Sequence, residues 1–211
     1  MKTIKERTKT HFIYKWYLYV FLLIVFIVLD ILIISYIIKP KSNEKVTIFV
    51  GSSKVNNDLL EDKIYSLNDN NLKEVNILDY SPDDYYFGVS LTSAGVVNTD
   101  LIIVPLDKIN ESFAAQYCKR IDEMEFKINY DFEFVSYSSI NYGIKVYSKD
   151  LNISLFEKYI TYNEEENEYL EYGLFFNKDS VNLKDLFKET NSKYSNNATK
   201  VFYGLMDEEN E

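Results

Sequence analysis

The chain divides into one strongly apolar segment and a longer region in which short apolar runs alternate with polar turns. Residues 16–38 contain seventeen Leu, Ile, Val and Phe side chains, and their only formal charge is Asp30. At a rise of about 1.5 Å per residue, a helix of this length extends roughly 34 Å, enough to cross a hydrocarbon core of about 30 Å. The pattern therefore predicts a transmembrane helix over residues 16–38.

Asp30 lies close to the centre of this span. A central Asp costs roughly +2.5 to +3.5 kcal/mol, whereas the seventeen large apolar residues together contribute about −5 to −10 kcal/mol, so insertion is favoured. Ionisable groups inside membranes usually face protein or water, which makes Asp30 a candidate contact with a partner helix. The alternative is an acid that a strongly apolar anchor tolerates without any role.

More basic residues precede the span than follow it. Because short basic segments stay in the cytoplasm, the N-terminus is expected inside the cell.

The segment Ile37-Ile38-Lys39-Pro40 offers no small-residue cleavage site. An uncleaved signal anchor in the cell membrane is therefore expected. We divide the chain into a cytoplasmic basic tail (1–15), the anchor (16–38), a linker (39–45) and an extracytoplasmic domain (46–211). Five cations precede the span and three follow it: Lys2, Lys5, Arg7, Lys9 and Lys15, then Lys39, Lys41 and Lys45.

The first part of the outer domain alternates strand and helix patterns. Runs rich in β-formers at 46–50, 75–77 and 100–105 predict strands. Between them, helices are expected from Asn57 to Leu67 and from Pro82 to Gly95, the latter with Asp83 and Asp84 in its first turn. Because no hairpin-length turn joins these strands, they predict βαβ crossovers. The fold class is therefore α/β with a mostly parallel sheet.

The second part predicts an antiparallel addition to that sheet. Strands are expected at 132–137 and 142–147, joined by a turn, and at 169–177. The acidic run at 164–166 is typical of a solvated loop. Helices are expected at 110–124, 154–160, 181–189 and 197–206.

Composition narrows the function classes. Residues 1–45 hold eight of the 23 Lys and Arg and three of the 33 Asp and Glu, so the outer 166 residues carry 15 cations against 30 acids, a net charge of −15. Such a domain repels nucleic acid and anionic lipid, and nucleic-acid binding is not expected. Cys118 is the only cysteine, so it forms no intramolecular disulfide. The Lys-, Asn-, Ile- and Tyr-rich composition is typical of a bacterial protein.

Catalytic patterns are missing from the outer domain. The sole histidine is His11 in the tail, so Ser-His-Asp, Cys-His and histidine-ligated zinc sites do not arise there. Phosphate-binding, dinucleotide-binding, nucleophile-elbow and EF-hand motifs do not occur either. Asp83 and Asp84 could hold a cation in principle, but helix N-terminal charge explains them more simply. We therefore expect a non-enzymatic protein without cofactor or metal.

Three segments in order resemble the bacterial extracellular solute-binding proteins of the type 2 periplasmic-binding fold, the receptors of ABC importers. They are Asn98-Thr-Asp-Leu-Ile-Ile-Val-Pro105, Tyr142-Gly-Ile-Lys-Val-Tyr147 and Tyr172-Gly-Leu-Phe-Phe-Asn-Lys-Asp-Ser-Val181. The resemblance implies one lobe of a receptor with ligand loops near the carboxyl ends of the strands, where open α/β sheets bind ligands. The ligand-binding positions that it implies are Ser52, Ser53, Leu106, Asp107, Asn141 and Tyr142.

The chain departs from that family in length, because a second lobe of about 100 residues has no counterpart after Asn177. One hypothesis is a membrane-anchored, non-catalytic module that binds a small solute or a partner and is accessory to a transporter. The other is a structural or regulatory subunit of a membrane complex that has no small-molecule ligand. Both place the chain as a single-pass protein with its N-terminus inside.

Overall fold

The computed structural model of the protein describes residues 4–67, 72–124, 132–163, 169, 171–183 and 196–209. The chain forms two compact units, Met1–Lys39 and Pro40–Glu211. The expected acidic loop at 164–166 and most of the expected helix at 181–189 lie outside the described residues.

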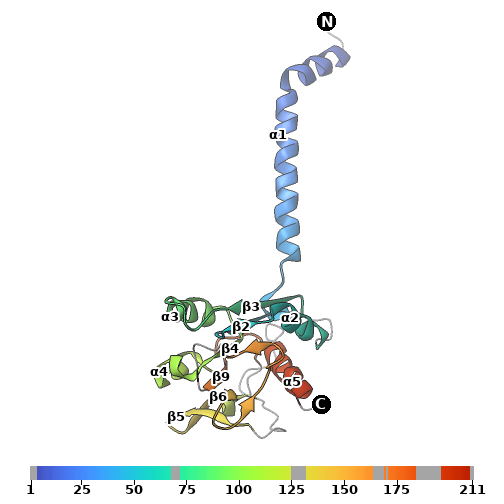
Figure 1. Ribbon diagram of the computed structural model, residues 1–211. Coiled ribbons are helices and arrows are strands. Elements are labelled where there is room, and N and C mark those ends of the chain that lie inside the picture. The colour runs from blue at the N-terminus through green and yellow to red at the C-terminus, as the bar shows by residue number, and fades with distance from the viewer. Residues whose placement is uncertain are drawn as a thin grey trace. The chain divides into compact units, whose positions relative to one another are not determined.

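The first unit consists of helix α1 (Ile4–Ile38), which is interrupted by non-helical backbone at Lys15 (Figure 1). Its segment Lys15–Tyr36 has a mean hydropathy of 3.0, and none of it is buried within the chain. By length and composition, α1 is a candidate N-terminal membrane-spanning helix. Asp30 is exposed on it.

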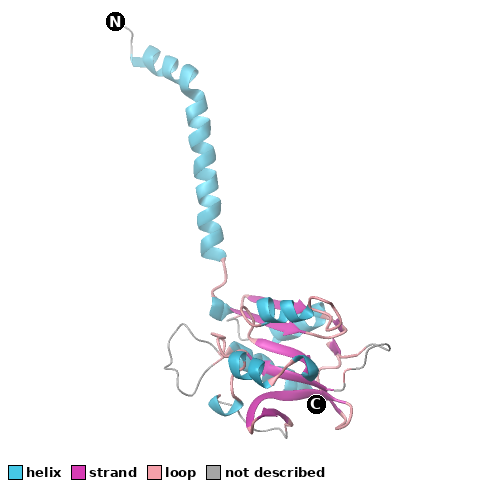
Figure 2. Cartoon of the chain, turned by 90° about the vertical axis from the view of Figure 1, so that its left-hand side faces the viewer, coloured by secondary structure: helices cyan, strands magenta, loops and turns pink. Residues whose placement is uncertain are grey.

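The second unit is built on a seven-stranded sheet, whose strands are magenta in Figure 2. The strand order is β3-β1-β4-β9-β6-β5, and β7 also pairs with β6. Two short strands form a separate antiparallel pair, β2 (Lys54–Val55) with β8 (Ile160–Thr161). The sheet strands are β1 (Lys45–Val50), β3 (Glu74–Asp79), β4 (Leu101–Pro105), β5 (Phe134–Tyr137), β6 (Ile140–Ser148), β7 (Ile153–Ser154) and β9 (Glu171–Phe176).

The sheet is mixed. Strand β1 pairs in parallel with β3 and β4, whereas the β4–β9, β9–β6, β6–β5 and β6–β7 pairs are antiparallel. The α/β class is confirmed, but the antiparallel part is larger than the sequence predicts. Strand β9, late in the chain, lies between β4 and β6, and nothing local in the sequence indicates that position.

Alternating side chains along the central strands give the sheet two apolar faces. In β4, Leu101 and Ile103 belong to one buried cluster, while Ile102 and Val104 belong to another. The first cluster contains residues of α2 (Asn57–Ser66) and α5 (Asn197–Glu209), and the second contains residues of α3 (Phe87–Ser90) and α4 (Glu111–Tyr117). These helix pairs lie on opposite sides of the sheet in Figure 1. Every residue of β4 is buried, so this strand is covered on both faces.

Three predicted helices differ from the structure. The helix expected from Pro82 begins only at Phe87, because the residues before it form a turn in which Asp84 accepts a hydrogen bond from the Tyr86 N–H. This helix continues as a π-helical turn, η2 (Leu91–Gly95). The helix expected at 110–124 ends at Tyr117, and a separate 3-10 turn, η4 (Ile121–Glu123), follows it.

The expected helix at 154–160 does not form. Ser154 belongs to β7 and Ile160 to β8, and Phe156 between them has a positive φ of 68°, which a right-handed helix cannot contain. The predicted helix after β1 is present, but Asn56 rather than Asn57 caps it, by accepting from the Leu59 N–H.

The linker segment that precedes β1 is fixed to the folded unit. It forms a 3-10 turn, η1 (Ser42–Glu44). The Asn182 side-chain amide donates to the Ser42 carbonyl at 3.1 Å and to the Lys45 carbonyl at 2.7 Å. The Asn197 amide donates to the Asn43 carbonyl at 2.9 Å. The residues just before the sheet are therefore part of the domain and not a free tether.

Candidate functional site

Four of the six predicted ligand residues meet at one edge of the sheet. We call the edge at which β1, β3 and β4 end the carboxyl edge, and the edge at which they begin the amino edge. Ser52 and Ser53 follow β1, and Leu106 and Asp107 follow β4 in a 3-10 turn, η3 (Leu106–Lys108). Since β1 and β4 are parallel neighbours, these four residues lie at the carboxyl edge as predicted.

The two serines at the carboxyl edge bond to the chain itself. Ser52 is fully buried, and its hydroxyl donates to the Lys54 carbonyl at 3.4 Å. The Ser53 hydroxyl donates to the Tyr162 carbonyl at 3.3 Å. These contacts connect the loop after β1 to the segment that carries β8.

The two residues after β4 have different surroundings. Leu106 packs against Gly173 of β9, where a Cβ atom on the glycine would lie only 2.6 Å from the Leu106 Cδ2. The Asp107 side chain is 56% exposed and pairs with Lys108 at 3.5 Å. Among the four residues, Asp107 therefore presents its side chain most openly to solvent.

Aromatic rings cover this edge of the sheet. Tyr162 lies 4.9 Å from both Tyr147 and Tyr172, measured between ring centroids, and Tyr169 lies 6.1 Å from Tyr172. The Tyr172 hydroxyl donates to the Tyr162 carbonyl, and the Tyr169 hydroxyl donates to Asp83 at 2.5 Å. Burial raises the pKa of Tyr169 and of Tyr172, so both hydroxyls remain protonated donors near neutral pH. The carboxyl edge is thus closed by internal contacts.

The remaining two predicted residues, Asn141 and Tyr142, lie at the amino edge. Strands β4 and β6 are both antiparallel to β9, so they run in the same direction. Asn141 and Tyr142 stand at the start of β6, and the next residue, Gly143, is level with Phe175 and hence with Ile102 near the start of β4. Asn141 accepts a hydrogen bond from the Ser136 hydroxyl at 2.6 Å. The six residues therefore do not form one site.

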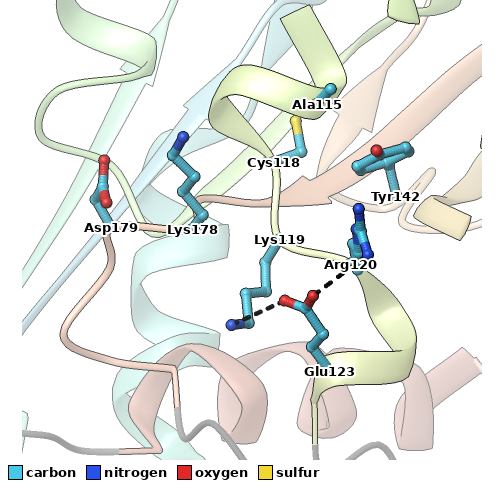
Figure 3. A pocket seen from close by; sticks show the side chains of 8 residues that line it. All are labelled: Ala115, Cys118, Lys119, Arg120, Glu123, Tyr142, Lys178 and Asp179. Atoms are coloured by element: carbon cyan, nitrogen blue, oxygen red, sulfur yellow. Dashed lines mark ion pairs between the residues drawn. The ribbon is translucent and has the colours of Figure 1, made fainter. Parts of the chain in front are cut away.

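Tyr142 instead lines a pocket of about 420 Å³ at the amino edge (Figure 3). Three cations, two acids, a thiol and an aromatic ring surround it. The lining residues are Ala115, Cys118, Lys119, Arg120, Glu123, Tyr142, Lys178 and Asp179.

Backbone pairing brings the two halves of the pocket together. Cys118 leaves α4 with extended backbone (φ −96°, ψ 143°) and forms an isolated antiparallel bridge with Asn177, just after β9. The Lys119 N–H donates to the Phe176 carbonyl at 2.7 Å, and the Lys178 N–H donates to the Tyr117 carbonyl at 3.0 Å. This pairing also explains why the helix predicted at 110–124 stops before Cys118.

One acid in the pocket joins two of its cations. Glu123 contacts two cations, Lys119 at 3.2 Å and Arg120 at 3.7 Å, as the dashed lines in Figure 3 show. Burial raises the pKa of Cys118 to about 12, and the nearby Lys178 opposes that shift only in part. The thiol is therefore protonated near neutral pH and is not an activated nucleophile. Within the described part of the chain, no cluster of His, Cys, Asp and Glu could hold a metal ion.

A buried carboxylate, Asp100, organises the polar groups next to the pocket. It accepts hydrogen bonds from the Thr47 N–H at 2.8 Å, from the Asn182 amide at 3.0 Å and from the Ser180 hydroxyl. Burial raises its pKa, and these hydrogen bonds oppose the shift. Asp100 therefore connects β1, β4 and the segment after β9 at the amino edge.

Several residues at the amino edge were not predicted from the sequence as functional. Lys119, Arg120 and Glu123 fall within the predicted helix 110–124, and Lys178 follows a predicted strand. Their only local signal is a Lys-Arg pair followed by an acid, which is common on solvated helices. The contacts that join them depend on the placement of β9 beside β4, which is a tertiary feature.

Comparison of the chain with protein-family models, with curated proteins and with solved structures finds no match in any of the three.

Proposed function

We propose that the chain is a single-pass membrane protein whose outer α/β domain is a non-catalytic binding module that works beside another membrane protein. One observation carries this proposal: the helix Lys15–Tyr36 is long and apolar enough to cross a membrane, and none of it is buried within the chain. Lipid or a partner helix must cover such a surface, since apolar side chains in water are unfavourable.

The fixed linker supports a module that acts close to its anchor. Residues from Ser42 onward are hydrogen-bonded to Asn182 and Asn197, so few residues remain between the domain and the apolar helix. A long flexible tether would let a domain search a wide volume, and a short one limits it to nearby partners.

As part of this proposal, the outer domain is arranged like one lobe of the extracellular solute-binding proteins. The parallel strands β3, β1 and β4, separated along the chain by α2 and α3, support the βαβ arrangement that the resemblance requires. The closed carboxyl edge favours an interaction surface over a buried ligand site there, because Ser52, Ser53 and the tyrosine rings bond within the chain.

Site-specific cross-linking in intact membranes tests the proposal. A photo-reactive residue replaces Asp107 at the carboxyl edge or, as the control, Lys200 on α5, both of which have exposed side chains. We expect Asp107 to yield a discrete adduct with one membrane protein at a level well above that of Lys200. Equal, diffuse labelling from both positions would contradict a specific interaction at this edge.

Asp30 favours a second candidate function, a structural or regulatory subunit without a small-molecule ligand. It is exposed on α1, and a carboxyl group in a membrane span usually meets protein or water. In this function, Asp30→Leu should abolish co-purification of the partner from detergent extracts, whereas Ile31→Leu, the matched change at the neighbouring exposed position, should preserve it. If the partner still co-purifies with the Asp30→Leu variant, Asp30 does not contribute to the interface.

A further inference from the structure

We propose that the pocket at the amino edge binds a small oxyanion, either phosphate or the carboxylate of a small organic acid. Three cationic side chains, Lys119, Arg120 and Lys178, surround a space of about 420 Å³. This site goes beyond the proposed function, and its existence does not depend on a membrane partner.

The charged side chains that line the pocket are mostly positive, whereas the domain as a whole has a negative net charge. Residues 46–211 carry a net charge of −15, yet the pocket places three cations against the two acids Glu123 and Asp179. An anion inside a pocket that three cations line is attracted to each of them. The local excess of positive charge therefore favours an anionic ligand.

Glu123 leaves most donors of Arg120 open. Its contact with the Arg120 Nη1 is long, at 3.7 Å, and the same carboxylate also contacts Lys119 at 3.2 Å. A guanidinium has five N–H donors, and its planar fork matches two oxygens of a carboxylate or phosphate. Arg120 is 46% exposed at its side chain, so an incoming oxyanion can reach these donors.

The site is held by backbone contacts before any ligand arrives. The Cys118–Asn177 bridge and the hydrogen bonds on either side of it fix the segments that carry Lys119 and Lys178. In Figure 3, Lys178 stands on one side of the pocket, and Arg120 and Tyr142 stand on the other. Tyr142 is 5% exposed, so its ring forms a fixed wall. Such preorganisation lowers the entropic cost of binding.

Calorimetric titration of the full-length chain in detergent tests this inference. The probes are sodium phosphate and sodium succinate, with sodium chloride at equal ionic strength as the control for non-specific screening. We expect saturable heat with at least one oxyanion and none with chloride. Phosphate alone, or succinate alone, would identify which source of oxyanion the site takes, and the absence of saturable heat with both would overturn the inference.

Variants separate binding at this pocket from binding elsewhere. Arg120→Gln and Lys178→Gln should each weaken the affinity about tenfold, which is the effect of losing one charge-assisted hydrogen bond. Lys200→Gln on α5 removes an equal charge from an exposed site outside the pocket and should leave the affinity within about twofold of the wild type.

Glu123→Gln gives a result that damage to the fold cannot imitate. Removing this carboxylate frees Arg120 for the ligand and removes a negative charge from the pocket, so the affinity should increase about threefold or more. Wild-type affinity in both Arg120→Gln and Glu123→Gln would overturn the inference, because the bound anion would then lie elsewhere.

Discussion

At the scale of single residues, Gly143 shows how closely the sheet is packed, and Gly88 in a helix provides the contrast. A Cβ atom at Gly143 of β6 would lie 2.7 Å from the backbone carbonyl oxygen of Leu174, which cannot move aside without breaking the β6–β9 ladder. At Gly88 of α3, nothing lies within 4 Å of the corresponding position.

Alanine at these two glycines should therefore have opposite effects. Gly143→Ala should lower the free energy of unfolding by about 2–4 kcal/mol through steric strain. Gly88→Ala should raise it by about 0.5–1 kcal/mol, because alanine favours a helix. Chemical denaturation followed by far-UV circular dichroism measures both changes, and a harmless Gly143→Ala would contradict the close approach of β6 and β9.

Asp100 gives the stability of the domain a defined pH dependence. Burial raises its pKa above 3.8 in the folded chain, so the folded state binds this proton more tightly than the unfolded state does. Its contribution to stability is therefore complete below the ordinary pKa of 3.8 and declines as the pH rises through the raised, folded pKa.

The variant Asp100→Asn has no carboxyl group at this position and should not show that decline. The difference in unfolding free energy, wild type minus variant, should fall as the pH rises above 3.8, by about 1.4 kcal/mol for each unit by which the pKa is raised. Denaturation at a series of pH values measures the difference. A difference that grows with pH would mean that the folded pKa is lowered instead.

At the scale of elements, the hairpin of β5 and β6 turns through two serines with positive φ. Ser138 has a φ of 49° and Ser139 a φ of 65°, the left-handed region that two-residue hairpin turns favour and that glycine adopts most easily. Ser139→Gly should therefore stabilise the domain by about 0.5–1 kcal/mol. Ser139→Ala, which keeps the strain, should not. Thermal unfolding compares the two, and equal melting temperatures would argue against a strained turn.

Local pattern predicted the elements whose boundaries are set locally. The apolar runs of β1 and β4, the helix α2 and the β5–β6 hairpin all follow from periodicity and turn residues. The helix predicted at 110–124 failed because Cys118 pairs with Asn177, which is distant in sequence, and the helix predicted at 154–160 failed at Phe156. Periodicity carries no information on such long-range pairings.

In the candidate sites too, the sequence predicts what is set locally and misses what depends on long-range pairing. The sequence placed Ser52, Ser53, Leu106 and Asp107 at one edge, because parallel strands end together. It could not separate Asn141 and Tyr142 from them, since that requires knowing that β9 runs between β4 and β6. The pocket of Lys119, Arg120 and Lys178 depends on the same strand and was not predicted.

At the scale of the whole molecule, the proposed function requires α1 to cross a membrane with the acidic domain on the outer side. The five cations before the span, against three after it, favour this orientation. Chemical labelling of single cysteines in intact cells tests it most directly, because Cys118 is the only natural cysteine and Cys118→Ser removes it.

In that background, Lys200→Cys places a thiol at an exposed position of α5, and Lys5→Cys places one in the N-terminal tail. A maleimide that cannot cross membranes should label Lys200→Cys in intact cells, and it should label Lys5→Cys only after the cells are permeabilised. Labelling of Lys5→Cys alone in intact cells would reverse the orientation, and release of the domain from the membrane fraction would show that the helix is not an anchor.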